Sequence, residues 1–507
     1  MLAALSAAAA AAHGPRPAVV APAGWELTFA DLHAAAWCAA ARFVRLGIGP
    51  GDVVAVALGP TPDQVVTMIG AALAGATPAA LNAAWWPRDL RAAADALAPE
   101  LIVAPTSVSN LLDDHHRVQV IEPASSRAEL LDGAPLAASR AAAPTGLIGF
   151  TGGATGEPRM IEHGPEQVRR LALRAAAHGD AEALAALDPS TALGLSVLLG
   201  ALAAGGAVHL LGPWSAAAAL EQLSRRRFAR LWATGPQLAE LAGALADGSG
   251  PAGGVGALEV SGGALHERPA AELCRRLGAA LVTRYSLSEA GGWAAARRWA
   301  PRPAGPAGSA GPGGPAGYDA LLVGHAAEGV ELRLGEPGAP ARPGEAQALW
   351  VRGPAVTRPQ IHRAAAPEAP PAADEPGADG DGWTPTGDLA CLTEAGLRLL
   401  GRRVDAFERG GRLVTPAEVE VALARHPDLL DVVVVPRPDP AEGAVGVAVT
   451  VPRDPENPPF LGDLAELLEA AVAAEARPAA QVIADALPLT PTGLVARRLL
   501  AYDERNR

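Results

Sequence analysis

The chain has 507 residues, which is too long for one hydrophobic core and indicates two or three domains. Hydrophobic residues make up 50% of the chain but aromatic residues only 4%, and much of the apolar content is Ala, which is typical of small-residue helices and not of a membrane protein. The net charge of -13 argues against nucleic acid as the main partner.

The basic and sulfur-containing residues narrow the class of protein further. All 41 basic side chains are Arg, because the chain contains no Lys. Cys38, Cys274 and Cys391 are far apart and form no CxxC or Cys/His pattern. This spacing fits a reducing compartment without structural zinc, and we therefore expect a cytoplasmic protein.

Two apolar stretches raise the question of a membrane. The first 14 residues have no basic segment, so they favour a helical start of the first domain over a signal peptide. Residues 191–211 are long enough to span a bilayer, but Gly205 and Gly206 interrupt them. The sequence therefore predicts a buried helix followed by a strand, and no membrane span.

From Trp25 onward the chain alternates amphipathic helices with short apolar strands. A helix is predicted over 27–47, with its start marked by Thr28 and Asp31, then a strand over 53–58 and a helix over 63–76. Residues 81–105 repeat the same order. Such alternation predicts a mostly parallel sheet with helices on both faces.

The composition changes twice further along the chain. Two stretches rich in Pro, Gly and Ala, 297–317 and 363–382, are expected to be surface loops. After Gly401 the pattern predicts strands over 429–438 and 443–454, with helices over 417–426 and 461–476. The predicted fold class is therefore α/β plus α+β. A large N-terminal domain of several subdomains, residues 1–400, precedes a small α+β domain, residues 401–507.

Five segments combine residues that can carry chemistry. The first, 146–160, runs from an apolar strand into a loop of Thr and Gly. Backbone N–H groups and Thr hydroxyls in such a loop can surround phosphate oxygens, although an ordinary turn has the same composition. It is not a Walker A loop, because it lacks the GK[ST] sequence.

The second and third segments place polar groups next to predicted strands. Residues 261–266 precede a helix and the strand 280–292, where Tyr285 could stack on a base and Glu289 could hold Mg²⁺. The alternative is a helix N-cap at Ser288. In residues 382–392, Asp388 could accept ribose hydroxyls or could be a turn residue.

The fourth and fifth segments, 399–423 and 486–500, complete the series. Taken together in this order, the five segments resemble the signature motifs of the adenylate-forming superfamily. That superfamily includes acyl-CoA and aryl-CoA synthetases, nonribosomal peptide adenylation domains and luciferases. The resemblance runs the whole length of the chain.

The resemblance implies an activity and its partners. Members join a carboxylic acid to AMP, taken from ATP with loss of pyrophosphate, and usually pass the acyl group to a thiol. We therefore expect ATP and Mg²⁺, a carboxylic acid substrate, and coenzyme A or a carrier protein as acceptor. Because two anions must meet, the site needs hydrogen-bond donors and a cation as well as Mg²⁺. The small domain would be a mobile lid, with the site between it and the large domain.

The resemblance also assigns roles to single residues. The phosphate loop would consist of Thr151, Gly152, Gly153, Ala154, Thr155 and Gly156. Adenine would lie beside Gly263, Ala264 and Tyr285, phosphate beside Ser288, and the ribose beside Asp388 and Arg402. Glu289 would bind Mg²⁺, and both Thr151 and Glu289 would be catalytic.

Several of these positions depart from the family pattern. Gly152 and Ala154 stand where hydroxyl residues are common, Arg159 stands where Lys is common, and Ser288 replaces Thr. In the hinge motif, Val404 replaces the first Asp of a pair and Asp405 is the second.

The largest departure is Leu494, which occupies the position of the catalytic lysine that bridges carboxylate and phosphate. Losing one oriented cation at a developing charge costs about 3–4 kcal/mol, or roughly 10²- to 10³-fold in rate. The site could be impaired, another group such as Arg497 or Arg498 could substitute, or the chain could process a preformed adenylate.

The leading hypothesis is ATP- and Mg²⁺-dependent activation of a carboxylic acid as an acyl adenylate, most simply toward an acyl-CoA or acyl thioester. The alternatives are a catalytically impaired nucleotide- or acyl-binding homologue and an amide-forming ligase.

The acyl pocket would follow residues 189–195, where Thr191 and Ala192 stand. Residues 113–117, DDHHR, contain metal ligands, but they are expected to form a solvated loop, because adjacent side chains on a flexible segment do not easily converge on one ion.

Overall fold

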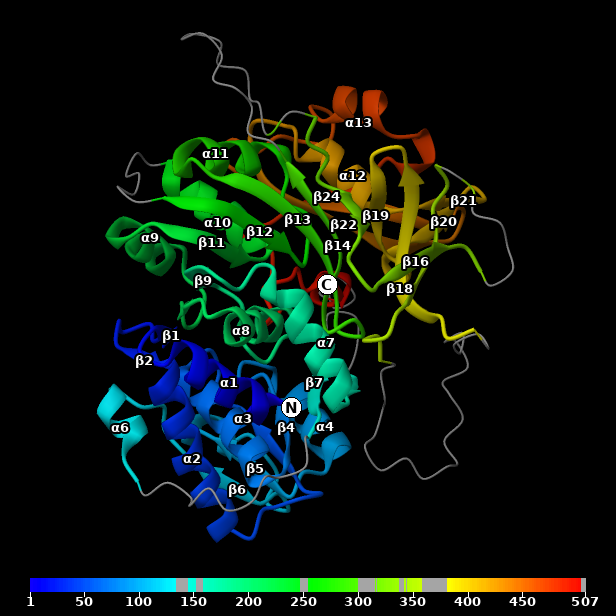
Figure 1. The fold of residues 1–507 in the computed structure, drawn as a ribbon. Coiled ribbons are helices and arrows are strands. Elements are labelled where there is room, and N and C mark those ends of the chain that lie inside the picture. Colours follow the sequence, from blue (N-terminus) through cyan, green and yellow to red (C-terminus); the bar gives the residue numbers. More distant parts are fainter. Residues whose placement is uncertain are drawn as a thin grey trace.

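The computed structural model describes residues 1–133, 145–151, 158–246, 254–299, 315, 317–336, 342, 344–357 and 381–502. Within these residues the strands form sheets of six, thirteen and five strands (Figure 1). The two predicted surface loops, 297–317 and 363–382, fall largely outside the described residues.

The N-terminal sheet is parallel except at one edge. Its strand order is β6 (Val118–Val120), β5 (Leu101–Ala104), β3 (Val53–Val56), β4 (Thr77–Ala80), β7 (Leu147–Phe150) and β8 (Met160–His163). Only the β7–β8 pair is antiparallel. The helices α3 (Pro62–Ala74) and α4 (Pro87–Leu97) make the crossovers between its parallel strands. This part confirms the predicted alternation of strand and helix.

The first long helix begins as the sequence predicts. The helix α2 (Phe29–Arg45) starts after Thr28, whose backbone N–H donates to Asp31 Oδ2 over 3.0 Å. The Asp31 N–H donates back to Thr28 Oγ1 over 3.1 Å. This reciprocal pair is a capping box, which satisfies two backbone donors at the exposed helix start.

The central sheet combines a parallel half and an antiparallel half. The parallel half, in order, is β13 (Ala280–Leu287), β12 (Val255–Ser261), β11 (Phe228–Ala233), β9 (Ala183–Ala185), β10 (Val208–Leu210) and β1 (Pro17–Val20), with β2 (Glu26–Thr28) antiparallel at the edge. The antiparallel half is β14 (Gly292–Trp299), β15 (Leu322–Ala326), β19 (Gly396–Arg402), β18 (Thr384–Thr393), β17 (Gln347–Arg352) and β16 (Glu331–Leu334). The alternation that predicts parallel strands was found over residues 25–105, and it does not extend to this second half. Its hairpin connections, such as β13–β14, are too short for the crossover helix that parallel pairing requires.

One hydrophobic core joins the N-terminal and central sheets. It includes residues of α1 (Leu2–His13), α2, α3 and α8 (Ala192–Ala204), and of strands from both sheets. The α8 helix is followed by β10, which confirms the buried helix and strand predicted for residues 191–211. Across the described ranges, no helix is both long and apolar enough to cross a membrane. A second core packs α9 (Ala216–Arg225), α10 (Gly235–Ala246) and α11 (Glu267–Leu277) against β11–β13.

The C-terminal sheet belongs to a small α+β unit, drawn in orange and red in Figure 1. Its path is β21 (Arg412–Val414), β20 (Phe407–Arg409), β23 (Gly443–Pro452) and β22 (Leu429–Asp439), and β24 (Ala480–Ile483) pairs with β23. The helices α12 (Pro416–Leu423) and α13 (Ala465–Ala471) cover it, and α14 (Arg497–Tyr502) follows. The predicted strands and helices of this region are confirmed. The sheets change between Arg402 and Phe407, and we propose that the domain boundary lies at this junction.

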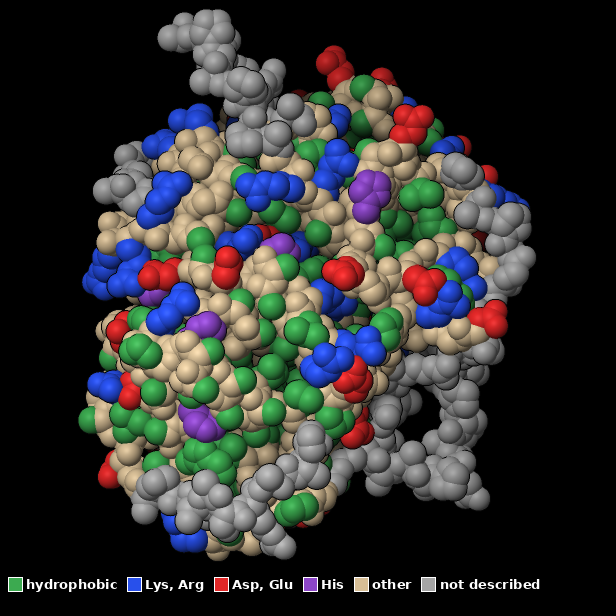
Figure 2. Space-filling model, viewed as in Figure 1, with side chains coloured by type: hydrophobic (Ala, Val, Ile, Leu, Met, Phe, Trp, Pro, Cys, Tyr) green, Lys and Arg blue, Asp and Glu red, His purple; other side chains and the backbone are tan. Residues whose placement is uncertain are grey.

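The surface carries charge of both signs. On the face in Figure 2, acidic and basic side chains are interspersed and do not gather into one patch. The last helix of the described residues, α14, reaches the N-terminal unit, because Arg498 Nη2 lies 2.9 Å from Asp89 Oδ2 of α4.

Candidate active site

A polar network joins β13 to the β18–β19 hairpin. The Tyr285 hydroxyl donates to Asp388 Oδ2 over 2.5 Å, and Arg402 Nε lies 3.0 Å from Asp388 Oδ1. Burial, with the Asp388 carboxylate second, raises the pKa of the Tyr285 phenol well above its usual range. The Asp388 carboxylate raises the pKa of Arg402. The phenol therefore stays protonated and the guanidinium charged, and three predicted nucleotide residues meet at one place.

Glu289 lies in the turn between β13 and β14. The Gly291 N–H donates to the Ser288 carbonyl over 2.9 Å, so the segment is a hairpin turn. The alternative of a helix N-cap at Ser288 is therefore wrong. Burial raises the pKa of the Glu289 carboxyl, while the charges of Arg402 and Arg159 act to lower it. Within the part of the chain that the structure describes, this carboxylate accepts a hydrogen bond from its own backbone and forms no ion pair.

The base of the candidate phosphate loop is fixed by a pair of hydrogen bonds. The Thr151 N–H donates to the Arg159 carbonyl over 2.8 Å, and the Arg159 N–H donates to Thr151 Oγ1 over 2.9 Å. The Ser288 hydroxyl donates to the Phe150 carbonyl over 3.4 Å, which brings this base to the Glu289 turn. The remaining loop positions, Gly152, Gly153, Ala154, Thr155 and Gly156, lie outside the described residues.

The candidate adenine wall is the turn after β12. Gly262 and Gly263 have φ angles of 72° and 103°, a left-handed backbone that only Gly adopts without strain. A Cβ atom at Gly263 would lie 3.1 Å from Pro236 Cδ, so the turn, which also contains Ala264, packs against the start of α10. The Ser261 hydroxyl donates to Ser286 Oγ over 2.8 Å and holds β12 beside β13.

Leu494 lies against this same turn. The Thr234 hydroxyl donates to the Gly493 carbonyl over 3.0 Å in a buried contact between the large and small units. A Cβ atom at Gly262 would lie 3.0 Å from Leu494 Cδ2. The Leu494 N–H donates to Thr490 Oγ1 over 3.1 Å, which closes the loop. The structure therefore places an aliphatic side chain at the candidate adenine wall.

Two family models match the chain. The model of the AMP-binding enzyme covers residues 6–359, and that of the AMP-binding enzyme C-terminal domain covers residues 418–494. The chain belongs to the AMP-binding enzyme family. The matches agree with the adenylate-forming resemblance of the five motifs, and Leu494 is the last residue that the second model covers.

Among relatives of this family member, a 2-succinylbenzoate–CoA ligase of Geobacillus kaustophilus is 26% identical over 411 residues, which cover 79% of this chain and 78% of that protein. A probable CoA ligase of Humulus lupulus is 34% identical over 160 residues, and the match spans only 31% of this chain and 29% of that protein. An indoleacetate–CoA ligase of Aromatoleum aromaticum is 34% identical, over 32% of its length.

Solved structures share the fold along the whole chain. ATP-bound MatB from Rhodopseudomonas palustris has a TM-score of 0.80 and 21% identity, with 99% of this chain and 98% of that one covered. The O-succinylbenzoate coenzyme A synthetase of Bacillus subtilis, in complex with ATP and magnesium, has a TM-score of 0.77 and 22% identity, with 98% of each chain covered. Both share the arrangement of a large N-terminal and a small C-terminal domain.

The two residues of the candidate hinge motif make unequal contacts. Val404 is 69% exposed, whereas Asp405 Oδ2 lies 3.7 Å from Arg497 Nε. Arg497 also makes two hydrogen bonds to Glu420, of 2.6 and 2.8 Å, which the sequence did not predict. The only signal for that pair was a Glu in the first turns of a predicted helix. Asp405 is thus tied to the small domain, and Val404 offers no polar group.

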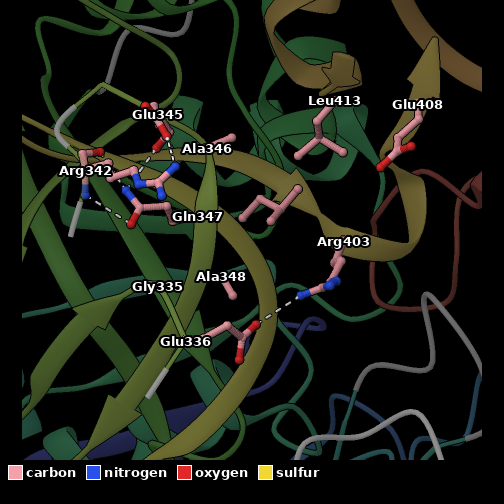
Figure 3. A pocket seen from close by; sticks show the side chains of 11 residues that line it. Gly335, Glu336, Arg342, Glu345, Ala346, Gln347, Ala348, Arg403, Glu408 and Leu413 are labelled. Carbon is pink, nitrogen blue, oxygen red and sulfur yellow. Dashed lines mark hydrogen bonds and ion pairs between the residues drawn. The ribbon is translucent and has the colours of Figure 1, made fainter. Parts of the chain in front are cut away.

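A groove lies beside this hinge motif, between the β16–β17 edge and the β20–β21 hairpin (Figure 3). Arg403 crosses it, with its Nη1 atom 3.5 Å from Glu336 Oε1. Glu408 and Leu413 line the side that belongs to the small domain. The groove separates the two domains next to the residues expected to form the pivot.

A further contact ties α14 to the N-terminal unit. Arg498 Nη2 donates to Asp89 Oδ2 over 2.9 Å, and the guanidinium lies 4.4 Å from the centre of the Trp86 ring. Asp89 belongs to α4, and Trp86 precedes it. Together with the Thr234–Gly493 bond, this contact holds the Leu494 loop against the large domain.

The predicted acyl-pocket residues have structural partners. The Thr191 hydroxyl accepts from the Gly194 N–H over 3.1 Å and donates to the Asp188 carbonyl over 2.7 Å, so it caps α8. Ala192 is the first residue of that helix. The sequence did not predict the buried ion pair between β12 and β13, in which the fully buried Glu259 pairs with Arg284 over 2.7 Å.

Proposed function

We propose that this protein is an adenylate-forming acyl ligase, which binds ATP with Mg²⁺ and activates a carboxylic acid as an acyl adenylate. The observation that carries the proposal is the meeting of Tyr285, Asp388, Arg402 and Glu289 between the central sheet's two halves in a chain of this family. Relatives whose names identify them as CoA ligases support coenzyme A as the thiol acceptor. A carrier protein remains the alternative acceptor.

The nucleotide roles follow from the contacts of each group. Asp388 would accept the ribose hydroxyls, because its two oxygens face Tyr285 and Arg402 and are held in place by them. Gly263 and Ala264 would lie along adenine, since Gly263 is exposed and has no side chain, and Ala264 has only a methyl group. Thr151 and Ser288 would face the phosphates from the base of the loop, since the Ser288 hydroxyl already reaches the strand that ends before Thr151.

The Glu289 carboxylate is suited to bind Mg²⁺. Its carboxylate is 7% exposed and burial raises its pKa, so the ionised form lacks a full counter-charge. A divalent cation bound to carboxylate oxygen would supply that charge. When bound, Mg²⁺ neutralises phosphate charge and favours displacement at the α-phosphate. The residues of the chain supply binding and orientation.

A second candidate function rests on Leu494. By the family resemblance, a lysine at this position would bring a positive charge to the reacting carboxylate and phosphate, whereas the Leu494 side chain lies against the Gly262 turn. An aliphatic group cannot offset the negative charge of the carboxylate and phosphate. Gly152 and Ala154 also remove two hydroxyl donors from the loop. A nucleotide- or acyl-binding protein with impaired adenylation would have these features. The small domain, which we propose to be a mobile lid, would still close over the nucleotide.

Two measurements separate these functions. Calorimetric titration with ATP, in the presence of Mg²⁺, is expected to show binding that Asp388→Ala abolishes. Asp428→Ala, which changes an exposed aspartate in the small domain, is the matched control and is expected to bind normally. ATP–pyrophosphate exchange with a panel of acids then measures turnover. Exchange at rates normal for such ligases would exclude the impaired protein, and absence of nucleotide binding would exclude both the ligase and an impaired nucleotide-binding protein.

We also propose that the protein works in the cytoplasm. Its three cysteines, Cys38, Cys274 and Cys391, are free thiols. Free cysteines are typical of proteins that work in a reducing compartment. Fractionation of the native host, followed by detection of the chain, would test this location.

A further inference from the structure

Three metal-binding side chains meet on the N-terminal sheet, outside the residues assigned to the nucleotide. Asp95 lies near the end of α4, and His115 and His116 lie in the turn between α5 (Thr106–Ser109) and β6. The Nε2 atom of each histidine is 3.0 Å from Asp95 Oδ1. Across the described ranges, this is the only group of three or more His, Cys, Asp or Glu side chains whose ligand atoms lie within 4.8 Å of one another.

The segment is largely exposed, as expected, but its adjacent histidines converge, which the sequence did not predict. The His116 N–H donates to the Asp113 carbonyl over 3.1 Å, so the segment is a closed turn and not an extended chain. The turn places both imidazoles on the same side, with ring centroids 4.0 Å apart. The two rings therefore converge on one carboxylate oxygen, although their residues are neighbours in the sequence.

The spacing matches the coordination sphere of a small transition-metal ion. Bonds of about 2.0–2.1 Å at tetrahedral angles separate neighbouring ligand atoms by about 3.3 Å. The two Nε2–Oδ1 distances of 3.0 Å need only a small expansion to reach that value. One ion at the centre of the group would replace the two histidine–aspartate hydrogen bonds with three metal bonds.

The ligand types select the kind of ion. Two imidazoles and one carboxylate suit Zn²⁺ and related first-row ions, whereas Mg²⁺ and Ca²⁺ prefer oxygen ligands alone. The side chains of His115 and Asp95 are 64% and 49% exposed, so an ion can enter and water can complete its coordination. The His116 side chain is only 5% exposed and gives the group a fixed member.

We propose that Asp95, His115 and His116 form a zinc site that fastens the turn to α4. Zn²⁺ that binds the folded chain and not the unfolded chain would stabilise the fold by mass action. The proposal does not depend on the assignment of the nucleotide site, and its test needs no activity measurement.

The test uses the full chain without an affinity tag, freed of metal with a chelator. Excess Mg²⁺ in the buffer occupies sites built from oxygen ligands, and Zn²⁺ is then titrated by calorimetry. We expect one ion per chain, and at least tenfold weaker binding in His115→Ala and in Asp95→Asn. His325→Ala, which removes an exposed histidine of β15, is the matched control and should bind as the unchanged chain does.

A second readout identifies the ligands. Co²⁺ in place of Zn²⁺ should give the visible absorption of a four-coordinate ion in the unchanged chain and lose it in His115→Ala. Zn²⁺ should also raise the thermal midpoint of the unchanged chain and not that of this variant. Circular dichroism checks that each variant is folded. Absent zinc binding, or equal binding in all variants, would show a hydrogen-bonded group only and would overturn the proposal.

Discussion

Restoring a cation at position 494 is the most direct test of what Leu494 does. The loop that carries it is already docked, through the Thr234 hydroxyl on Gly493 and the Leu494 N–H on Thr490. Lys is longer than Leu and ends in a charge, so Leu494→Lys would extend past the Gly262 turn without having to order the loop.

The expected gain follows from the electrostatics of the site. One oriented donor or cation at a developing negative charge contributes about 3–4 kcal/mol to the transition state, or roughly 10²- to 10³-fold in rate. We expect the lower end of this range. The phosphate loop lacks two hydroxyl donors at Gly152 and Ala154, and the new lysine does not replace them.

The assay is ATP–pyrophosphate exchange at saturating ATP and Mg²⁺ with a panel of acids. Leu494→Met, which is flexible but uncharged, is the matched control and should leave the rate unchanged. Adding Thr234→Val to Leu494→Lys removes the hydroxyl that anchors Gly493, at a cost of about 0.5–1.5 kcal/mol, and should reduce the gain. Equal rates for the Lys and Met variants, with nucleotide binding intact, would refute the reasoning.

Three further predictions concern contacts that the structure adds. Arg498→Ala should loosen the docked loop by about 1–2 kcal/mol, because the ion pair with the buried Asp89 and the ring contact are both lost. Amide hydrogen exchange over residues 489–495 should become faster. Arg497→Met leaves the buried Glu420 carboxylate without its cation, with only the Val434 N–H still donating to it. It should lower the free energy of unfolding of the small domain by about 3–5 kcal/mol, with partial recovery on adding Glu420→Leu, and urea denaturation measures both. Burial raises the pKa of Asp63 to about 6, so its ionised form destabilises the fold above pH 6 and this penalty disappears toward pH 4. Asp63→Asn should therefore have a higher thermal midpoint than the unchanged chain at pH 8, and the difference should shrink at pH 4.

Much of the local structure could be predicted from the sequence. The start of α2 followed from Thr28 and Asp31, because a capping box needs only residues three positions apart. The strands β22 and β23 followed from their apolar runs. The antiparallel half of the central sheet could not be predicted, because strand order depends on which distant segments pair, and short apolar strands look alike in either direction.

The candidate site divides in the same way. Its residue types stood out in the sequence, but their assembly depends on contacts between distant segments, such as Tyr285 and Asp388, which are 103 positions apart. The roles assigned to these residues stay predictions that the experiments above can test. The Glu289 turn was open to a helical alternative until the β13–β14 hairpin excluded it.

By itself, the sequence determined the family, the order of the motifs and the absence of the lysine, because each of these is a property of residue identity and spacing. Only the tertiary structure decided where Leu494 lies, since its contact with Gly262 requires the small domain to dock on the large one. It also decided that His115 and His116 converge on Asp95, because a turn and a helix from different parts of the chain must pack together to align three ligand atoms.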